Sequence, residues 1–252
     1  MSKAVYDLTE KQINLGFQQK DRDLIEKETD FILNKTVAVM LSIFSDKIEG
    51  ITFDHYGVAI KNDYLLSKKH QKNLLKWLNR LVQIKYPSSD LEFGKLKVDL
   101  EIWYYEMGGE EIQFHYKDEY LLTPKDTAEK MGISKVTLNK YIKQGLESLE
   151  TSSHNKIPMY VIELWKDPVY SIKIQMIAQQ KKMLNQSPIE RYKEINEELS
   201  ELHIKYKKYS FNDAFGHLSG DDLEDPTDYY LWRDLEEERE ELLKQLGDVD
   251  LD

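Results

Sequence analysis

The chain contains no cysteine among its 252 residues. Disulfide bonds and thiol catalysis are therefore excluded. It also has no apolar run of about eighteen residues, the length that predicts a membrane-spanning helix. The first residues, MSKAVYDLTEKQ, lack the apolar core of a secretory signal peptide. These absences predict a cytoplasmic protein with no membrane partner.

The motifs of several common enzyme classes are missing as well. The chain has no GxxxxGK phosphate loop, no GxGxxG after a strand, no GxSxG elbow and no HExxH. No pair of its histidines has the spacing of zinc ligands; they are His55, His70, His115, His154, His203 and His217. We therefore expect no enzyme, no catalytic residue, no cofactor and no metal site.

The charge that is present is mostly negative and unevenly spread. The formal net charge is −11, which argues against a protein that coats nucleic acid. Residues 119–168 hold seven basic and seven acidic side chains, whereas residues 169–252 hold eleven basic and twenty acidic ones. A neutral DNA-binding module on an acidic chain would bind weakly as a monomer, so we expect a homodimer or higher oligomer.

Residues 1–118 are expected to form an α+β N-terminal domain, with helices followed by two hairpins around a helix. Residues 1–48 read as helical, and residues 67–86 read as an amphipathic helix that Pro87 ends. Apolar and polar residues alternate around Gly57, which predicts the first hairpin.

The second hairpin is predicted around Gly108 and Gly109. Residues 96–107 and 111–122 both alternate, and a glycine pair between two such runs is a two-residue hairpin signal. This interpretation places Trp103, Tyr104 and Tyr105 in a strand, where packing explains them better than base stacking does.

Residues 169–252 are expected to form an acidic helical C-terminal region. Ser187, Pro188 and Glu190 predict a helix start. Apolar residues then recur at spacings of 3 and 4: Tyr192, Ile195, Leu199, Leu202 and Tyr206. A helix over residues 229–246, ended by Gly247, is the expected partner, so a helical hairpin within one chain is favoured over a coiled coil.

The segment between these two helices interleaves aromatic and acidic residues. A solvated acidic loop is favoured over a calcium site, because the DxDxDG order of an EF-hand is missing. The stretch is also a candidate arm for binding a protein partner. Its candidate contact residues are Phe211, Phe215, Asp221, Asp222, Asp225 and Trp232.

Residues 119–168 contain the signals of two short helices joined by a tight turn. Thr123 is positioned to cap the first helix, with Pro124 at its first position. Gly132 permits the turn, Ser134 is positioned to cap the second helix, and Gly145 follows its end. Leu138, Tyr141 and Ile142 give the second helix a buried stripe.

This segment resembles the excisionase and MerR-like family of winged helix-turn-helix domains. The features that match are Thr123-Pro124, Ala128, Gly132-Ile133-Ser134, Thr137-Leu138, Gln144-Gly145 and Ile157-Pro158. The chain departs from the family pattern by Ile in the turn, by Gln before Gly145 and by a polar wing without Arg. The resemblance covers about one sixth of the chain.

The resemblance implies that the second helix enters the major groove of double-stranded DNA and that the wing meets the backbone or minor groove. Asn reads adenine, and Lys reaches guanine or phosphate. The implied DNA-binding residues are Lys135, Val136, Thr137, Asn139, Lys140, Lys143, His154 and Lys156.

The fold class expected is mainly α, with a smaller α+β N-terminal part, a central winged helix-turn-helix and a C-terminal helical hairpin. The function expected is sequence-specific DNA binding by a regulator, or by a recombination or segregation factor, of a bacterium or mobile element. The alternative is a protein-interaction module, such as a phage inhibitor of host defence or an antitoxin, that acts through the acidic C-terminal region.

Overall fold

The computed structural model describes residues 1–53, 60–84, 89–149, 155–220, 223 and 225–249. Contacts between residues divide the chain into two compact units, Met1–Lys181 (unit 1) and Lys182–Asp252 (unit 2). Helices make up most of the described chain, which confirms the expectation of a mainly α fold. No described helix is both long enough and apolar enough to cross a membrane.

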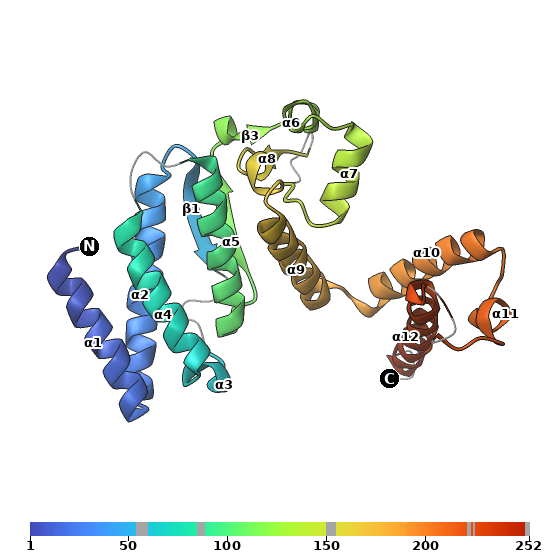
Figure 1. Cartoon of the computed structure of the whole chain (residues 1–252), viewed down its shortest axis with the longest axis horizontal. Helices are drawn as coiled ribbons and strands as arrows, with labels where there is room; N and C mark the ends of the chain where they lie inside the picture. Colours follow the sequence, from blue (N-terminus) through green and yellow to red (C-terminus); the bar gives the residue numbers. More distant parts are fainter. Residues whose placement is uncertain (54–59, 85–88, 150–154, 221–222, 224, 250–252) are drawn as a thin grey trace. The chain divides into compact units, whose positions relative to one another are not determined.

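Unit 1 begins with three packed helices, α1 (Lys3–Gln19), α2 (Arg22–Ile43) and α4 (Lys68–Gln83). Each starts at a side chain that accepts a backbone N–H, as N-cap residues do: Ser2, Asp21 and Ser67. The three helices lie side by side (Figure 1). The helices predicted within 1–48 and 67–86 are thus confirmed over these three ranges, while residues 44–48 are not helical and Pro87 falls outside the described residues.

The central helix of unit 1 is α5 (Asp90–Met107), and here the predicted strand over 96–107 is wrong. Ser89 and Glu92 form a capping box that starts the helix, and Gly108 ends it with a φ of 116°. Neighbours cover α5 on several sides, so residues 96–101 include both apolar and charged buried side chains. A helix buried all round loses the 3.6-residue pattern that identifies one face.

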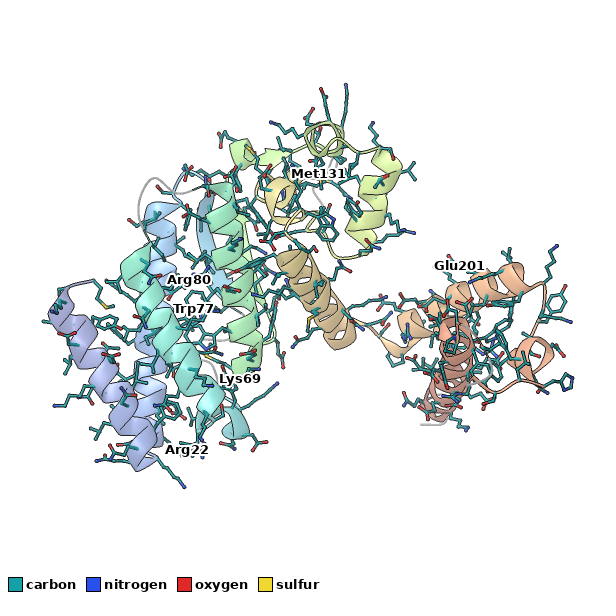
Figure 2. All side chains as sticks on the ribbon, viewed as in Figure 1. Arg22, Lys69, Trp77, Arg80, Met131 and Glu201 are labelled. Atoms are coloured by element: carbon teal, nitrogen blue, oxygen red, sulfur yellow. The ribbon has the colours of Figure 1, made fainter. Side chains whose placement is uncertain are left out.

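Trp77 and Arg80 of α4 illustrate how α5 is held (Figure 2). The Trp77 ring stacks on Trp103 with centroids 5.4 Å apart, and Arg80 Nη1 lies 2.6 Å from Asp99 Oδ2. Trp103, Tyr104 and Tyr105 are therefore buried side chains of a helix and not of a strand.

The strands of unit 1 pair across a long sequence separation. β1 (Ile48–Phe53) pairs antiparallel with β2 (Ile112–Tyr116), with Ile51 opposite Phe114. Neither expected hairpin is observed in the described residues: β2 pairs with β1 instead of 96–107, and α3 (Asn62–Leu65) stands where the first hairpin's return strand was expected. The expected turn at Gly57 lies outside the described residues.

The rest of unit 1 consists of short elements followed by a long helix. The 3-10 helix η1 (Asp118–Tyr120) leads into β3 (Leu121–Leu122), α6 (Pro124–Met131) and α7 (Lys135–Lys143). β4 (Ile157–Pro158) pairs antiparallel with β3, and α8 (Val161–Leu164) packs on α5 and α6. α9 (Pro168–Asn185) then leaves unit 1 at Lys181.

Unit 2 has its own apolar core. α10 (Pro188–Tyr206) packs against α12 (Thr227–Val249), and the short α11 (Phe211–Phe215) also packs on α12. The predicted helix start at Ser187 is confirmed as a capping box. α12 continues past Gly247, so the predicted end of that helix is wrong. The buried core of this unit comprises Ile195, Leu199, Leu202, Phe215, Trp232 and Leu235.

Candidate nucleic-acid interface

Two hydroxyl side chains determine where α6 and α7 begin. Thr123 Oγ1 accepts the backbone N–H of Asp126 at 3.2 Å, and Ser134 Oγ accepts that of Thr137 at 3.0 Å. Each bond satisfies one of the N–H groups that the first turn of a helix leaves unpaired. The expected cap residues are therefore the observed ones, and both helices start where local chemistry places them.

The turn between the two helices is built on Gly132. Its φ of 70° is in the left-handed region, and its backbone N–H bonds to the Glu129 carbonyl at 3.1 Å. The following residue, Ile133, donates its backbone N–H to the carbonyl of Ala128 at 3.0 Å. α6 and α7 pack against each other. Ala128 of α6 is buried, and Leu138 of α7 is fully buried. This packing fixes the angle at which α7 leaves the turn.

The outer face of α7 is open to solvent and positively charged. Five of the residues expected to meet DNA are exposed: Lys135, Val136, Asn139, Lys140 and Lys143. Val136 has 80 % of its surface exposed, which is unusual for an aliphatic side chain. α7 contains no carboxylate, and within the described residues its three lysines make no ion pair. Among the residues that the structure describes, no carboxylate pairs with the lysines of this face.

The other three residues expected to bind DNA are not exposed side chains of α7. Thr137 is half-buried, and its hydroxyl lies 2.9 Å from Ser134 Oγ, so it supports the helix start. Lys156 is half-buried and pairs with Asp118 at 3.3 Å. His154 lies outside the described residues. The structure therefore brings five of the eight side chains to one accessible face.

Paired backbone segments flank the segment expected to form the wing. Leu121 and Leu122 of β3 pair with Pro158 and Ile157 of β4. A further bridge joins Leu149 to Lys156, with N···O distances of 2.8 and 2.9 Å. The expected wing tip over 152–156 lies mostly outside the described residues, and its base is held next to α6.

A buried ionic network that the sequence interpretation missed supports this region. Lys97 Nζ of α5 lies 3.0 Å from Glu101 Oε2 and 2.8 Å from Glu147 Oε2. Lys181 Nζ of α9 lies 3.2 Å from Glu101 Oε1. Tyr160 donates a hydrogen bond to Glu147 as well. Glu147 follows α7 directly, so the network ties the end of α7 to α5 and α9.

The network remains charged although it is buried. Burial lowers the pKa of the Lys97 ammonium, but the charges of Glu101 and Glu147 outweigh this effect and hold that pKa above its ordinary value. Burial raises the pKa of Glu147, but Lys97 outweighs it and leaves that pKa below its usual range. Burial and the charge of Glu147 raise the pKa of Tyr160 well above its ordinary value, so the phenol stays a donor. Lys97 and Glu147 therefore form a charged pair near neutral pH.

The sequence signal for this network was a Lys and a Glu four residues apart, at 97 and 101. That spacing places both on one helix face. Because 96–107 was interpreted as a strand, this helical spacing was not recognised. Glu147 is distant in sequence from Lys97, and no pattern in the residues around it indicates that the two pair.

The residues expected to bind a protein partner do not form a single exposed surface. Phe215 and Trp232 are 6 % and 0 % exposed and form the core of unit 2, which is a correction to their expected contact role. Phe211 is half-buried, and its backbone N–H bonds to Glu236 at 3.0 Å. Asp225 is exposed, whereas Asp221 and Asp222 lie outside the described residues.

Within the described residues, no group of three or more His, Asp or Glu side chains is arranged to hold a metal ion. Comparison with known proteins finds no matching family model, no matching curated protein and no matching solved structure. The geometry of α6, α7 and the residues that support them is therefore what bears on function.

Proposed function

We propose that this chain is a sequence-specific DNA-binding protein that places α7 in the major groove. α6, the Gly132 turn, α7 and the β3–β4 pair would together act as a winged helix-turn-helix. Its biological role would be that of a regulator, or of a recombination or segregation factor, in a bacterium or mobile element. The observation that carries the proposal is the α7 face, on a chain of net charge −11. It has three lysines that make no ion pair with any described residue, an asparagine between them and no carboxylate.

Each exposed side chain of α7 has a distinct expected role. Asn139 can donate and accept toward the edge of adenine, a pairing that contributes about 1–3 kcal/mol of discrimination. Lys140 and Lys143 would mainly meet phosphates, and each phosphate contact adds about 0.9 to the slope of log K against log salt. Val136, which is exposed, would contact a thymine methyl.

The test is a binding selection from random duplexes, followed by anisotropy titrations at low and moderate salt. Lys135, Asn139 and Lys140 are changed together to Ala. The matched control changes Lys27, Asn34 and Lys35 of α2, which are exposed and have the same residue types and charge. Loss of binding in the α7 variant alone supports the proposal. Equal binding by the two variants would rule out α7 as the reading helix.

Self-association is the second part of this proposal, because a neutral module needs more than one copy for tight binding. α9 supplies a face suited to it: its exposed residues from 168 to 180 are all uncharged. Val169, Ile172 and Met176 are 59 %, 59 % and 64 % exposed. Two copies can pack there without like-charge repulsion. A charged partner would meet no opposite charge among these exposed residues. Sedimentation of Met176→Glu against the unmodified chain tests it, with a shift to monomer expected.

The alternative function is supported by the exposed side chains of α12. Leu231 and Leu243 are 42 % and 47 % exposed, and exposed acidic residues lie between them: Asp234, Glu237, Glu240 and Glu241. Exposed leucines interspersed with carboxylates suit a partner that offers both basic and apolar side chains. A stoichiometric partner that survives nuclease treatment, and is lost when Leu231 and Leu243 become Asp, would favour this alternative.

A further inference from the structure

The solvent-facing side of α4 is basic. Residues 64–89, which include α4, form the longest stretch of the chain without Asp or Glu, and six of them are Lys or Arg. On the neighbouring α2, by contrast, Asp23, Glu26 and Asp30 are exposed among the cations. The exposed residues of α4 are four lysines, two amides and one valine: Lys68, Lys69, Lys72, Lys76, Asn79, Gln83 and Val82. These four lysines and the half-buried Arg80 are called the basic face of α4.

Asp99 of α5 lies beside the basic face and is surrounded by cations. Its Oδ2 is 2.6 Å from Arg80 Nη1 and 3.8 Å from Lys76 Nζ, and its Oδ1 is 2.8 Å from Lys173 Nζ of α9. Burial raises the pKa of Asp99, but the hydrogen bond from Lys173 and the charges of Arg80 and Lys76 outweigh it, so that pKa stays below its ordinary value. The Asp99 side chain is 7 % exposed, whereas that of Lys76 is 58 % exposed. Solvent therefore meets the cation and not the carboxylate.

The other lysines of the basic face are neutralised even less. Lys69 Nζ pairs with Glu106 Oε1 at 2.9 Å, but the lysine side chain is 64 % exposed and that of Glu106 is 25 % exposed. Lys68 and Lys72 are exposed and make no ion pair with a described residue. Six cations, the five of the face and Lys173, therefore share two carboxylates, a formal excess of four positive charges. Formal charges cancel over unit 1 as a whole, so this excess is a local feature of a neutral unit.

The composition of the basic face suits a phosphate backbone better than a protein surface. The centres of protein interfaces are depleted in lysine and enriched in aromatic side chains, whereas Val82 is the one apolar residue among the exposed residues described for α4. Contacts to DNA phosphates come from lysine, arginine and amide side chains. The cations from Lys69 to Arg80 (Figure 2) have spacings of 3, 4 and 4, so they form a row about 17 Å long at about 1.5 Å per residue. Duplex DNA presents about ten phosphate charges over that length.

We propose that the basic face of α4 is a second DNA contact, which binds the phosphate backbone and does not read bases. This contact rests on the proposed DNA-binding function, which supplies the duplex. Each lysine that meets a phosphate releases condensed counterions, so the affinity gained is independent of sequence and falls as salt is added. α7 would supply discrimination between sequences, and α4 would add affinity that a neutral unit otherwise lacks.

The experiment is an anisotropy titration of the full chain with a random-sequence duplex and with the selected duplex, over a series of salt concentrations. Lys68→Gln and Lys72→Gln are combined in one variant, because neither side chain pairs with a carboxylate among the described residues. The steepness of log K against log salt is expected to fall by about 1.8 on both duplexes, about 0.9 for each lost phosphate contact. At about 50 mM salt the affinity should fall about tenfold for each contact. The ratio of the two affinities should not change, since no base contact is lost.

Two further variants control for charge and for folding. Lys27→Gln with Lys35→Gln removes the same charge from exposed positions of α2 and should leave the steepness nearly unchanged. Lys68→Arg with Lys72→Arg keeps the charge of α4 and should bind as the unmodified chain does. An unchanged steepness in the α4 glutamine variant overturns the proposal, and so does an equal loss in the α2 variant. An equal loss in the arginine variant would show that lost charge is not the cause, and it also overturns the proposal.

Failure of this contact and failure of the proposed function give different results. Binding of the random duplex that depends on α4, without any preferred sequence in the selection, rejects the reading role of α7 and leaves the α4 contact standing. Sequence-specific binding that the α4 glutamine variant retains in full rejects the α4 contact alone. Polyglutamate that displaces the chain as well as unlabelled duplex does would assign the basic face to an acidic protein and overturn the DNA assignment. No binding of either duplex overturns both.

Discussion

An added Cβ at Gly145 would lie 2.4 Å from the Cβ of Ala178, closer than two non-bonded carbon atoms can approach. Gly145 follows α7, and Ala178 belongs to α9, so this contact joins the end of the proposed recognition helix to the long helix behind it. The φ of Gly145 is 109°, a backbone conformation that other residues adopt at a cost.

Gly145→Ala is expected to lower the free energy of unfolding by about 3 kcal/mol, because backbone strain and overpacking add. Gly132→Ala is the matched control. Its φ is also positive, at 70°, but nothing lies within 4 Å of the added Cβ, so about 1 kcal/mol is expected. Urea unfolding measures both. Ala178→Gly should restore part of the loss at Gly145, and equal losses at the two glycines would show that the contact has no role.

His70 gives a prediction on pH. It is fully buried, and its Nε2 lies 2.9 Å from the hydroxyl of Thr29, which itself donates to the Ile25 carbonyl. The imidazole must therefore donate from Nε2, and its Nδ1 has no partner among the described residues. Burial lowers the pKa of His70 from 6.5 to about 4.

Between pH 6.5 and 4 the unfolded chain therefore binds a proton that the folded chain does not. Stability should fall as the pH decreases through this window, by up to about 3 kcal/mol, and this loss is absent above pH 7. Urea unfolding at pH 7.5 and pH 5 tests it, with His70→Gln as the comparison. The glutamine variant should lose less stability between the two pH values. If both proteins lose the same amount, His70 is not the titrating group.

Lys97 is expected to be the most sensitive charge in unit 1. Lys97→Met leaves the carboxylates of Glu101 and Glu147 buried without their shared cation, and we expect a loss of about 3–5 kcal/mol. Lys166→Met is the control, because its pair with Glu163 is more than half exposed and should contribute under about 0.5 kcal/mol. Thermal and urea unfolding give the comparison. A loss at Lys97 as small as that at Lys166 would mean that water reaches the network freely.

Trp232 tests the division of the chain into two units. It is fully buried in the core of unit 2, and Trp232→Ala is expected to destabilise that unit by about 3–5 kcal/mol. Hydrogen exchange measured by peptide should accelerate over α10 and α12 and stay unchanged over α1 to α5. Faster exchange in both sets of helices would show that the units unfold together.

Much of the local structure was predictable from sequence, and the reason is visible in individual residues. Ser134, Thr123 and Ser187 cap their helices through bonds that reach three residues along the chain. Such short-range interactions leave a signature in consecutive residues. The buried stripe of α10, from Ile195 to Leu202, was likewise predicted from its spacing.

The candidate interface was predicted in part. Lys135, Asn139 and Lys140 are exposed on one helix face as expected, while Trp232 and Phe215 turned out to be core residues. An aromatic side chain has the same local pattern on a binding surface as in a core, so only its neighbours in space decide between them.

By itself, the sequence determined where α6, α7 and α10 start and which face of α10 is apolar, because caps and periodicity act over three or four residues. The tertiary structure decided that β1 pairs with β2, that residues 96–107 are helical and that Lys97 meets Glu147. These outcomes depend on contacts between segments that are far apart in the sequence, such as Trp77 with Trp103 and Lys97 with Glu147. A buried charge is stable only when another part of the fold places an opposite charge beside it. No local sequence pattern indicates which residue that will be.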